Sequence, residues 1–176
     1  MTCAESFVLL QPYCDAPVCL VPFAQAGYWY GSDGRIAIRV HAPPGIADDP
    51  GMPNMAQLDW DRASDPRTVW YPLPNSIPPE TTKRCCLCQG KGKIKIAGDA
   101  IPCDGCDGSG MVLADLEADW TDLTPRIRLK NHYLRLLAGV PQPVEIGTRG
   151  NPHAPVAIRF PGGEGLLMPM RKPKED

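Results

Sequence analysis

Two cysteine motifs of the same form constrain this chain more than any other feature of its sequence. Each reads Cys-x-x-Cys-x-Gly-x-Gly; the first begins at Cys85 and the second at Cys103. Both thiolates of such a motif can reach one ion, and the glycines let the backbone turn sharply beneath the sulfurs. Two motifs together supply the four soft ligands that a tetrahedral zinc ion prefers.

The motifs therefore predict one Zn2+ ion per chain, with Cys85, Cys88, Cys103 and Cys106 as its ligands. Four protein ligands leave no open coordination position, so a structural site is expected rather than a catalytic one. Cys86 is a spare thiol in the first motif, but the spacing to Cys88 favours Cys85. Two disulfides or free buried thiols are the alternative.

The start of the chain bears on the choice between metal and disulfides. No Lys or Arg occurs before Arg35, and prolines interrupt the early apolar residues, so no signal peptide is predicted. The eight cysteines are then expected to be reduced thiols in the cytoplasm, some of them metal ligands. No apolar run approaches the length of a membrane span, and no membrane association is expected.

An enzymatic zinc site is the competing interpretation. Pro102-Cys103-x-x-Cys106 matches half of the zinc-deaminase signature, whose other half is His-x-Glu. The one upstream histidine, His41, is followed by Ala-Pro, so the third ligand and the general acid/base are both missing. His132 and His153 have no matching acid or nucleophile pattern either. An enzyme is therefore not predicted.

Cations surround the first cysteine motif. The formal net charge of -2 argues against a uniformly basic surface but leaves room for a local basic face. Such a patch can contact phosphate, or it can be solvated charge on a small ribbon that nearby aspartates partly offset. The residues concerned are Lys83, Arg84, Lys91, Lys93 and Lys95, of which the last three are the nucleic-acid-binding candidates.

Short strands and turns are expected in the first half of the chain. The 43% of hydrophobic residues can sustain a core despite 21 Pro and 17 Gly. Residues 27–30 and 35–40 predict the strands of a hairpin, joined through Ser32-Asp33-Gly34. Residues 41–79 are rich in Pro and Asp and predict extended loops, with a short strand near residues 68–71.

The C-terminal third predicts one helix followed by strands. Thr124 with Pro125 is typical of a helix start, and Gly139 is typical of a helix end. Strands are expected near residues 144–146 and 156–160, then a glycine-rich turn at 162–165 and a last strand at 166–170. Before the helix, residues 115–122 are acidic, and their apolar residues do not decide between helix and strand.

The predicted helix carries polar side chains on one face. Arg128, Asn131, His132 and Arg135 follow the spacing i, i+3, i+4, i+7, opposite much of the apolar stripe. Cations there can contact phosphate without reading base sequence. An ordinary solvated helix face is the alternative.

The cysteine motifs resemble the cysteine-rich repeats of DnaJ-type co-chaperones. In that family the motif recurs four times and makes two zinc sites, so the two copies here imply one site. The His-Pro-Asp signature of the J-domain is absent. The resemblance therefore implies the zinc module and not a chaperone activity.

A second resemblance covers the C-terminal third. Helix, strand, strand, glycine-rich turn and a final strand ending Met168-Pro169-Met170-Arg171 look like the last half-domain of bacterial DNA polymerase sliding clamps. Ser32 to Ile38 is similar to the recurrent clamp strand with Asp-Gly before an apolar run. The resemblance implies an α+β fold with one clamp-like domain, residues 1–82 and 112–171, an inserted zinc ribbon at 83–111 and a flexible tail at 172–176.

The clamp resemblance also implies surfaces for partners. In clamps the helices line the DNA-facing side, which would make the predicted helix face a DNA contact. The terminal strand borders the cleft that receives partner peptides, so Met168, Pro169 and Met170 are partner-binding candidates, with burial in the sheet as the alternative. A clamp chain has several such domains and closes a ring, whereas this chain has one at most. The sequence does not decide whether the chain forms a homo-oligomer.

The sequence thus predicts a non-enzymatic, zinc-binding accessory protein that associates with DNA without reading its sequence. The small size and mosaic build fit a phage or prophage origin. The alternative is a protein-interaction module that binds a replication, chaperone or defence partner. It would use the zinc ribbon or the terminal Met-Pro-Met strand.

Overall fold

The computed structural model describes residues 2–14, 19–96, 99–113 and 119–170. The chain divides into two compact units. Unit 1 comprises Met1–Ile77 and Trp120–Asp176, and unit 2 comprises Pro78–Asp119, which contains both cysteine motifs. In the described part of the chain, no helix is long and apolar enough to cross a bilayer.

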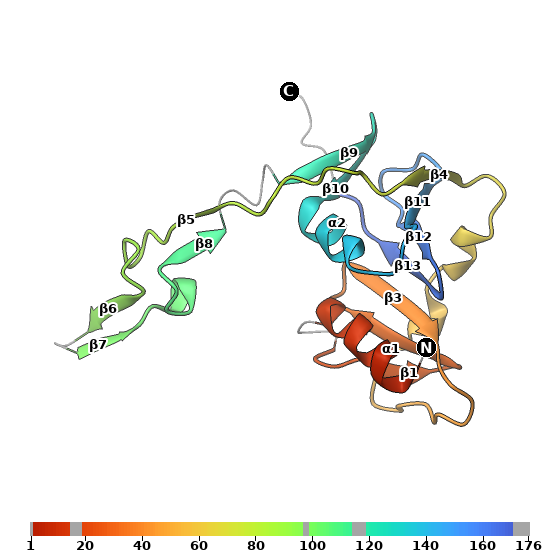
Figure 1. Cartoon of the computed structure of the whole chain (residues 1–176), viewed down its shortest axis with the longest axis horizontal. Coiled ribbons are helices and arrows are strands. Elements are labelled where there is room, and N and C mark those ends of the chain that lie inside the picture. The colour runs from red at the N-terminus through yellow and green to blue at the C-terminus, as the bar shows by residue number, and fades with distance from the viewer. Residues whose placement is uncertain (1, 15–18, 97–98, 114–118, 171–176) are drawn as a thin grey trace. The chain divides into compact units, whose positions relative to one another are not determined.

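Unit 1 is built on a seven-stranded antiparallel sheet with the strand order β1-β2-β3-β13-β12-β11-β4 (Figure 1). The fold is mostly β-sheet with few helices, which is compatible with the predicted α+β class. The strands are β1 (Phe23–Gln25), β2 (Tyr28–Ser32), β3 (Ile36–His41), β4 (Val69–Pro72), β11 (Glu145–Thr148), β12 (Val156–Phe160) and β13 (Gly163–Leu167).

The turn between β2 and β3 confirms the predicted hairpin. One carboxylate oxygen of Asp33 accepts the backbone N–H groups of Arg35 and Ile36, at 2.8 and 2.9 Å. Gly34 supplies the positive φ of 87° that the turn requires. The other Asp33 oxygen accepts the Tyr133 hydroxyl at 2.7 Å, so the same side chain also ties the turn to a helix.

Two eight-residue helices belong to unit 1: α1 (Cys3–Leu10) and α2 (Asn131–Ala138). A capping box of Thr2 and Glu5 begins α1. Both helices contribute to one apolar core with β3 and β11–β13, and the Tyr13 hydroxyl of the short helix η1 (Gln11–Tyr13) donates to the Leu136 carbonyl at 2.9 Å.

The order of elements in unit 1 repeats. The first half runs α1, β1, β2, β3, and the second runs α2, β11, β12, β13. The last strands of the two halves, β3 and β13, pair antiparallel at the centre of the sheet. The two halves therefore occupy equivalent positions on either side of that pair.

The predicted start of the second helix was wrong. Thr124 and Pro125 lie at the turn between β9 (Trp120–Thr124) and β10 (Ile127–Lys130), and α2 begins only at Asn131. The Thr124 hydroxyl accepts the N–H groups of Arg126 and Ile127, because the same hydrogen bonds that cap a helix can close a turn. Residues 115–118 of the undecided acidic segment lie outside the described residues.

The predicted glycine-rich turn at 162–165 was also too long. β13 begins at Gly163 and ends at Leu167, not at Met170. A Cβ on Gly163 would overlap the Phe160 ring, and one on Gly165 would overlap Ile38. These glycines are strand positions where neighbours pack closely, rather than turn positions.

The long loop region of unit 1 contains more structure than the sequence indicated. Two short 3-10 helices lie there, η2 (Met55–Gln57) and η3 (Trp60–Ala63), and β4 lies within one residue of its prediction. Trp60 is buried, and its indole N–H donates to the Met55 carbonyl at 2.8 Å. This contact makes η2 and η3 one packed segment.

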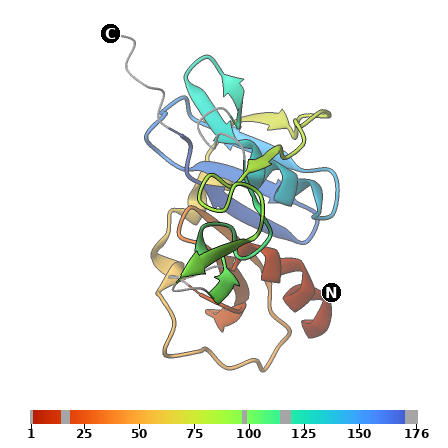
Figure 2. The same cartoon turned by 90° about the vertical axis from the view of Figure 1, so that its left-hand side faces the viewer.

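The described residues of unit 2 form two antiparallel strand pairs. β5 (Thr82–Arg84) pairs with β8 (Met111–Leu113), and β6 (Lys93–Ile96) pairs with β7 (Asp99–Pro102). One short 3-10 helix, η4 (Asp104–Cys106), completes its described elements. Figure 2 looks at this unit with the β6–β7 hairpin toward the viewer.

Candidate metal centre

The structure brings together the four cysteines that the two motifs predict. The sulfurs of Cys85 and Cys103 lie 3.8 Å apart, those of Cys88 and Cys106 lie 3.7 Å apart, and all four lie within 4.8 Å of one another. All four residues are buried, whereas Cys86 is exposed. Bonds of about 2.3 Å to one tetrahedral zinc ion would hold sulfurs about 3.8 Å apart, so the donor set fits a single metal ion.

Each motif makes the same contacts, displaced by 18 residues. The Gly92 N–H donates to the Cys88 sulfur at 3.3 Å, and the Gly110 N–H donates to the Cys106 sulfur at 3.2 Å. Amide donors of this kind stabilise thiolate charge. The two motifs therefore form two copies of one sulfur-holding loop.

The motifs also close on each other. The Cys103 N–H donates to the Gly92 carbonyl and the Cys85 N–H donates to the Gly110 carbonyl, both at 2.9 Å. A Cβ on Gly92 would overlap the Gly108 carbonyl oxygen, and one on Gly110 would lie 2.5 Å from that of Gly90. The last glycine of each motif is thus required because the first glycine of the other motif packs against it.

The thiols of the cluster differ in how readily they ionise. Burial opposes ionisation of Cys88, but the amides of Gly92 and Gly90 and the neighbouring thiols outweigh it and lower its pKa to about 7. Burial raises the pKa of Cys103 to about 12, and neighbouring thiols add to this. Cys103 therefore holds its proton at neutral pH without metal, and its binding to a metal ion would be coupled to proton release.

Of the candidate lysines, Lys93 and Lys95 lie on β6, and Lys91 lies in the bend before it. Lys91, Lys93 and Lys95 are all exposed, while Ile94 between them is half-buried and packs on the cysteines. A groove of about 600 Å³ runs along them, and Leu87, Gln89 and Ala100 also line it. The hairpin therefore presents one basic face, consistent with the alternation of a strand.

The predicted cationic helix face is not formed. Arg128 lies on β10, where its Nε donates to Asp122 at 3.0 Å and its guanidinium stacks 4.2 Å from the Trp120 ring centroid. Asn131 is 1% exposed and accepts the Thr121 hydroxyl at 2.6 Å. Of the four residues, His132 and Arg135 alone lie on α2 with exposed or half-buried side chains.

The Met168–Met170 segment continues beyond the main sheet. The Met168 N–H donates to the Arg35 carbonyl at 2.9 Å, and the Met170 N–H donates to the Arg128 carbonyl at 2.8 Å. The segment thus passes from the residue that precedes β3 to β10. Met168 is 44% exposed and lines a small apolar pocket of about 190 Å³ together with Met55 and Leu58.

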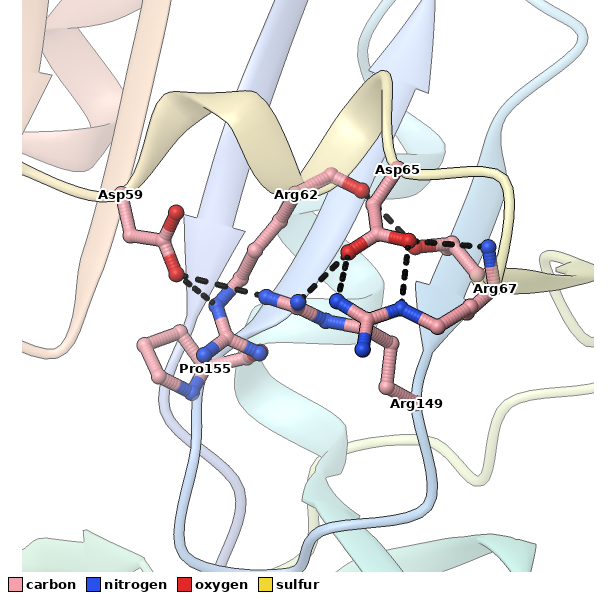
Figure 3. A network of polar contacts seen from close by, with 7 residues as sticks. Asp59, Arg62, Asp65, Arg67, Arg149 and Pro155 are labelled. Carbon is pink, nitrogen blue, oxygen red and sulfur yellow. Dashed lines mark hydrogen bonds and ion pairs between the residues drawn. The ribbon is translucent and has the colours of Figure 1, made fainter.

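A network of charges that no sequence motif indicated holds η3 and the residues that flank it against the sheet (Figure 3). Asp65 accepts from Arg67 and from Arg149, the latter at 2.6 Å, and Asp59 pairs with Arg62 at 2.8 Å and with Arg149 at 3.4 Å. Hydrogen bonds from Arg67 lower the pKa of Asp65 well below its usual range. The partners of Arg149 lie 84 and 90 residues away, so local sequence carries no signal for them.

No protein-family model, curated protein or solved structure matches this chain.

Proposed function

We propose that this chain is a non-enzymatic, zinc-binding accessory protein that associates with DNA without reading its sequence. The spacing of the four cysteine sulfurs carries the zinc part of the proposal. Soft thiolates in a tetrahedron favour zinc or iron–sulfur chemistry, and a compact site for one ion favours zinc. With four protein ligands, the ion would order the surrounding loops rather than activate water.

Metal analysis tests the zinc assignment. The purified chain should contain about one zinc, and Cys103→Ser should abolish binding because three sulfurs no longer close the tetrahedron. Cys86→Ser is the matched control, since Cys86 is exposed and outside the cluster, and it should retain the metal. Two zinc ions per chain, or loss of zinc in the Cys86 variant, would overturn the ligand set.

Association with DNA is the second part of the proposal. It is supported by the repeated order of one helix and three strands in unit 1, which is the kind of half-domain arrangement that the clamp resemblance implies. It is also supported by exposed cations on the zinc-bearing unit. A clamp-like scaffold holds DNA by position and charge, so binding should not depend on base sequence.

Binding of the full zinc-loaded chain to unrelated duplexes tests this part. Fluorescence anisotropy at low salt should give similar affinities for duplexes of different sequence, and the affinity should fall steeply as salt is added. Absence of binding at low salt would reject DNA association while leaving the zinc assignment intact.

A protein-interaction role is a second candidate because of the pocket at Met168. Met55, Leu58 and Met168 line it, and methionine side chains adapt to apolar partners. A replication, chaperone or defence protein could insert one apolar side chain there. Met168→Glu should then abolish co-purification of that partner, whereas Lys→Ala changes on β6 should not; the reverse pattern would exclude this pocket as the contact.

A further inference from the structure

Three exposed lysines, Lys91, Lys93 and Lys95, alternate with other residues in the sequence of unit 2 and are called the lysine row below. Lys93 and Lys95 are two residues apart on β6, whereas Lys91 lies in the bend before that strand and is separated from Lys93 by Gly92, which has a positive φ of 69°. Two residues of an extended strand span about 6.8 Å, and alternate phosphates of one DNA strand are also about 6.8 Å apart along the helix axis. The two strand lysines, Lys93 and Lys95, therefore match the spacing of a phosphate backbone, and Lys91 adds a third cation next to them in the chain.

Their charge is not neutralised within the described part of the chain. Lys93 lies opposite Pro102 and Lys95 lies opposite Ala100 in the hairpin, so neither has an acidic cross-strand partner. None of the three lysines forms an ion pair with another described residue. Arg39, Arg128 and Arg159 differ, since each is paired with a carboxylate and stacked on an aromatic ring.

The row depends on the cysteine cluster for its position. β6 begins directly after Gly92, and β7 ends directly before Cys103. The Cys103 N–H donates to the Gly92 carbonyl and so joins the two ends of the hairpin beside the cysteine cluster. The Lys91 N–H donates to the Cys88 carbonyl at 3.0 Å. Ile94, between Lys93 and Lys95 on β6, packs against a core cluster whose buried members, among the described residues, are the four cysteines alone. The metal would therefore hold the row in place.

The composition of unit 2 favours backbone contact over other modes of binding. Residues 78–119 contain no Phe, Trp or Tyr, so unit 2 offers no aromatic platform on which single-stranded bases could stack. Lysine is a compact point charge without the planar fork that selects one carboxylate geometry. A surface of this kind selects by charge density, and duplex DNA carries one charge per about 1.7 Å.

We propose that Lys91, Lys93 and Lys95 are the phosphate-contacting row through which this protein binds duplex DNA, and that the metal-loaded cysteine cluster is required for that contact. The inference rests on the proposed DNA association and narrows it to one hairpin. Of the two groups of nucleic-acid-binding candidates that the sequence predicted, it keeps the lysines of the zinc-bearing unit and leaves out the helix face.

The salt dependence of binding tests the row. Each phosphate neutralised contributes about 0.9 to the slope of log affinity against log salt, so changing all three lysines to alanine should reduce the slope by about 2.7. Between about 50 and 200 mM salt, the parent should then lose about 40-fold more affinity than the variant does. The variant must retain its zinc, which shows that its cluster is folded.

Two controls separate charge from fold. The triple Lys→Arg variant keeps the charge and should keep the slope. Removing the metal with a chelator, or through Cys103→Ser, should reduce the slope to the level of the alanine variant. Retention of the full slope without metal would overturn the required role of the cluster.

The outcomes distinguish this inference from the proposed function. If the parent binds DNA and the zinc-loaded alanine variant keeps the full slope, the lysine row is not the contact, although DNA association stands. If the parent binds no duplex at low salt, DNA association itself fails, and the row with it. If polyglutamate at matched charge displaces DNA more effectively than a second duplex does, the row binds an acidic protein segment and the phosphate assignment is wrong.

Discussion

The guanidinium carbon of Arg39 lies 4.1 Å from the centroid of the Trp60 ring. The same carbon lies 4.2 Å from the centroid of the Tyr28 ring. Glu164, on the neighbouring strand β13, pairs with the Arg39 guanidinium at 2.6 Å. Arg39 is on β3 and Trp60 is on η3, so this contact attaches the loop segment to the centre of the sheet. Among the described residues it is one of three places where an arginine stacks on a tryptophan and pairs with a carboxylate.

Replacing Arg39 should destabilise unit 1 more than replacing its exposed counterpart. Arg39→Met leaves Glu164 without its partner and removes a largely buried cation from two aromatic faces, which should cost about 1–3 kcal/mol of unfolding free energy. Arg159→Met is the matched control: it stacks on Trp70 and pairs with Glu145, but its side chain is 47% exposed. Arg159→Met should lower the unfolding free energy by about 1 kcal/mol or less, as measured by urea denaturation. Equal losses would contradict this ranking.

The close packing of the two cysteine motifs gives a second prediction. Gly92→Ala places a Cβ on the Gly108 carbonyl oxygen and should weaken zinc affinity strongly, because the backbone that aims the sulfurs must shift. Gly90→Ala is the control within the same motif. It has a similar positive φ, 83° against 69°, but its Cβ would meet the flexible side chain of Arg84.

Competition with a chromophoric chelator measures both affinities. Both variants carry the cost of a left-handed residue, about 1–2 kcal/mol, so the difference between them isolates the backbone overlap. Affinities that fall equally would mean that conformation alone, and not the contact between motifs, explains the second glycine of each motif.

The cysteine cluster and the β2–β3 hairpin could be predicted because their signals are local. Four cysteines at motif spacing already determine which sulfurs can meet, and Asp33-Gly34 makes its turn hydrogen bonds within three residues. The start of α2 could not be predicted in this way. Thr124 offers the same hydroxyl to a helix cap or to a turn, and the alternation of buried Ile127 and Leu129 decides for a strand.

The other features that the sequence did not predict correctly depend on contacts between distant segments. Gly163 and Gly165 are typical of a turn by sequence, but a Cβ at these positions would lie 2.8 Å from the Arg39 carbonyl oxygen and 2.9 Å from the Ala37 carbonyl oxygen of the distant strand β3. Arg149 and Asp65 are 84 residues apart in the sequence, so only the folded sheet brings them into contact. The helix face with Arg128 failed for the same reason, because the partners Trp120 and Asp122 appear only once β9 and β10 pair.

The network around Asp65 predicts a dependence of stability on pH. Its pKa in the folded protein lies below the unfolded value of about 3.9, because Arg67 and Arg149 favour the carboxylate. A lowered folded pKa contributes stability above the unfolded value, and that contribution disappears as pH falls below it toward the folded pKa. Asp65→Asn should therefore lower Tm at pH 7. The difference in Tm between this variant and the parent should disappear in acid.

Thermal unfolding followed between pH 7 and about pH 2 tests this dependence. Asp61→Asn is the control, because Asp61 is exposed and forms no ion pair with a described residue. Its effect on Tm should be small at every pH. A gap for Asp65→Asn that stays constant into acid would mean that the network acts through packing and not through charge.

Metal removal should affect the two units differently. The buried core of unit 1 contains none of the four clustered cysteines, whereas they are the only buried members of the described core cluster of unit 2. Hydrogen exchange with and without a chelator separates the two. The Cys103 amide, bonded to Gly92, should lose its protection when metal is removed, while the amide of Ile38 in the central strand β3 should keep its own. Loss of protection at both amides would show that unit 1 depends on the metal for its fold.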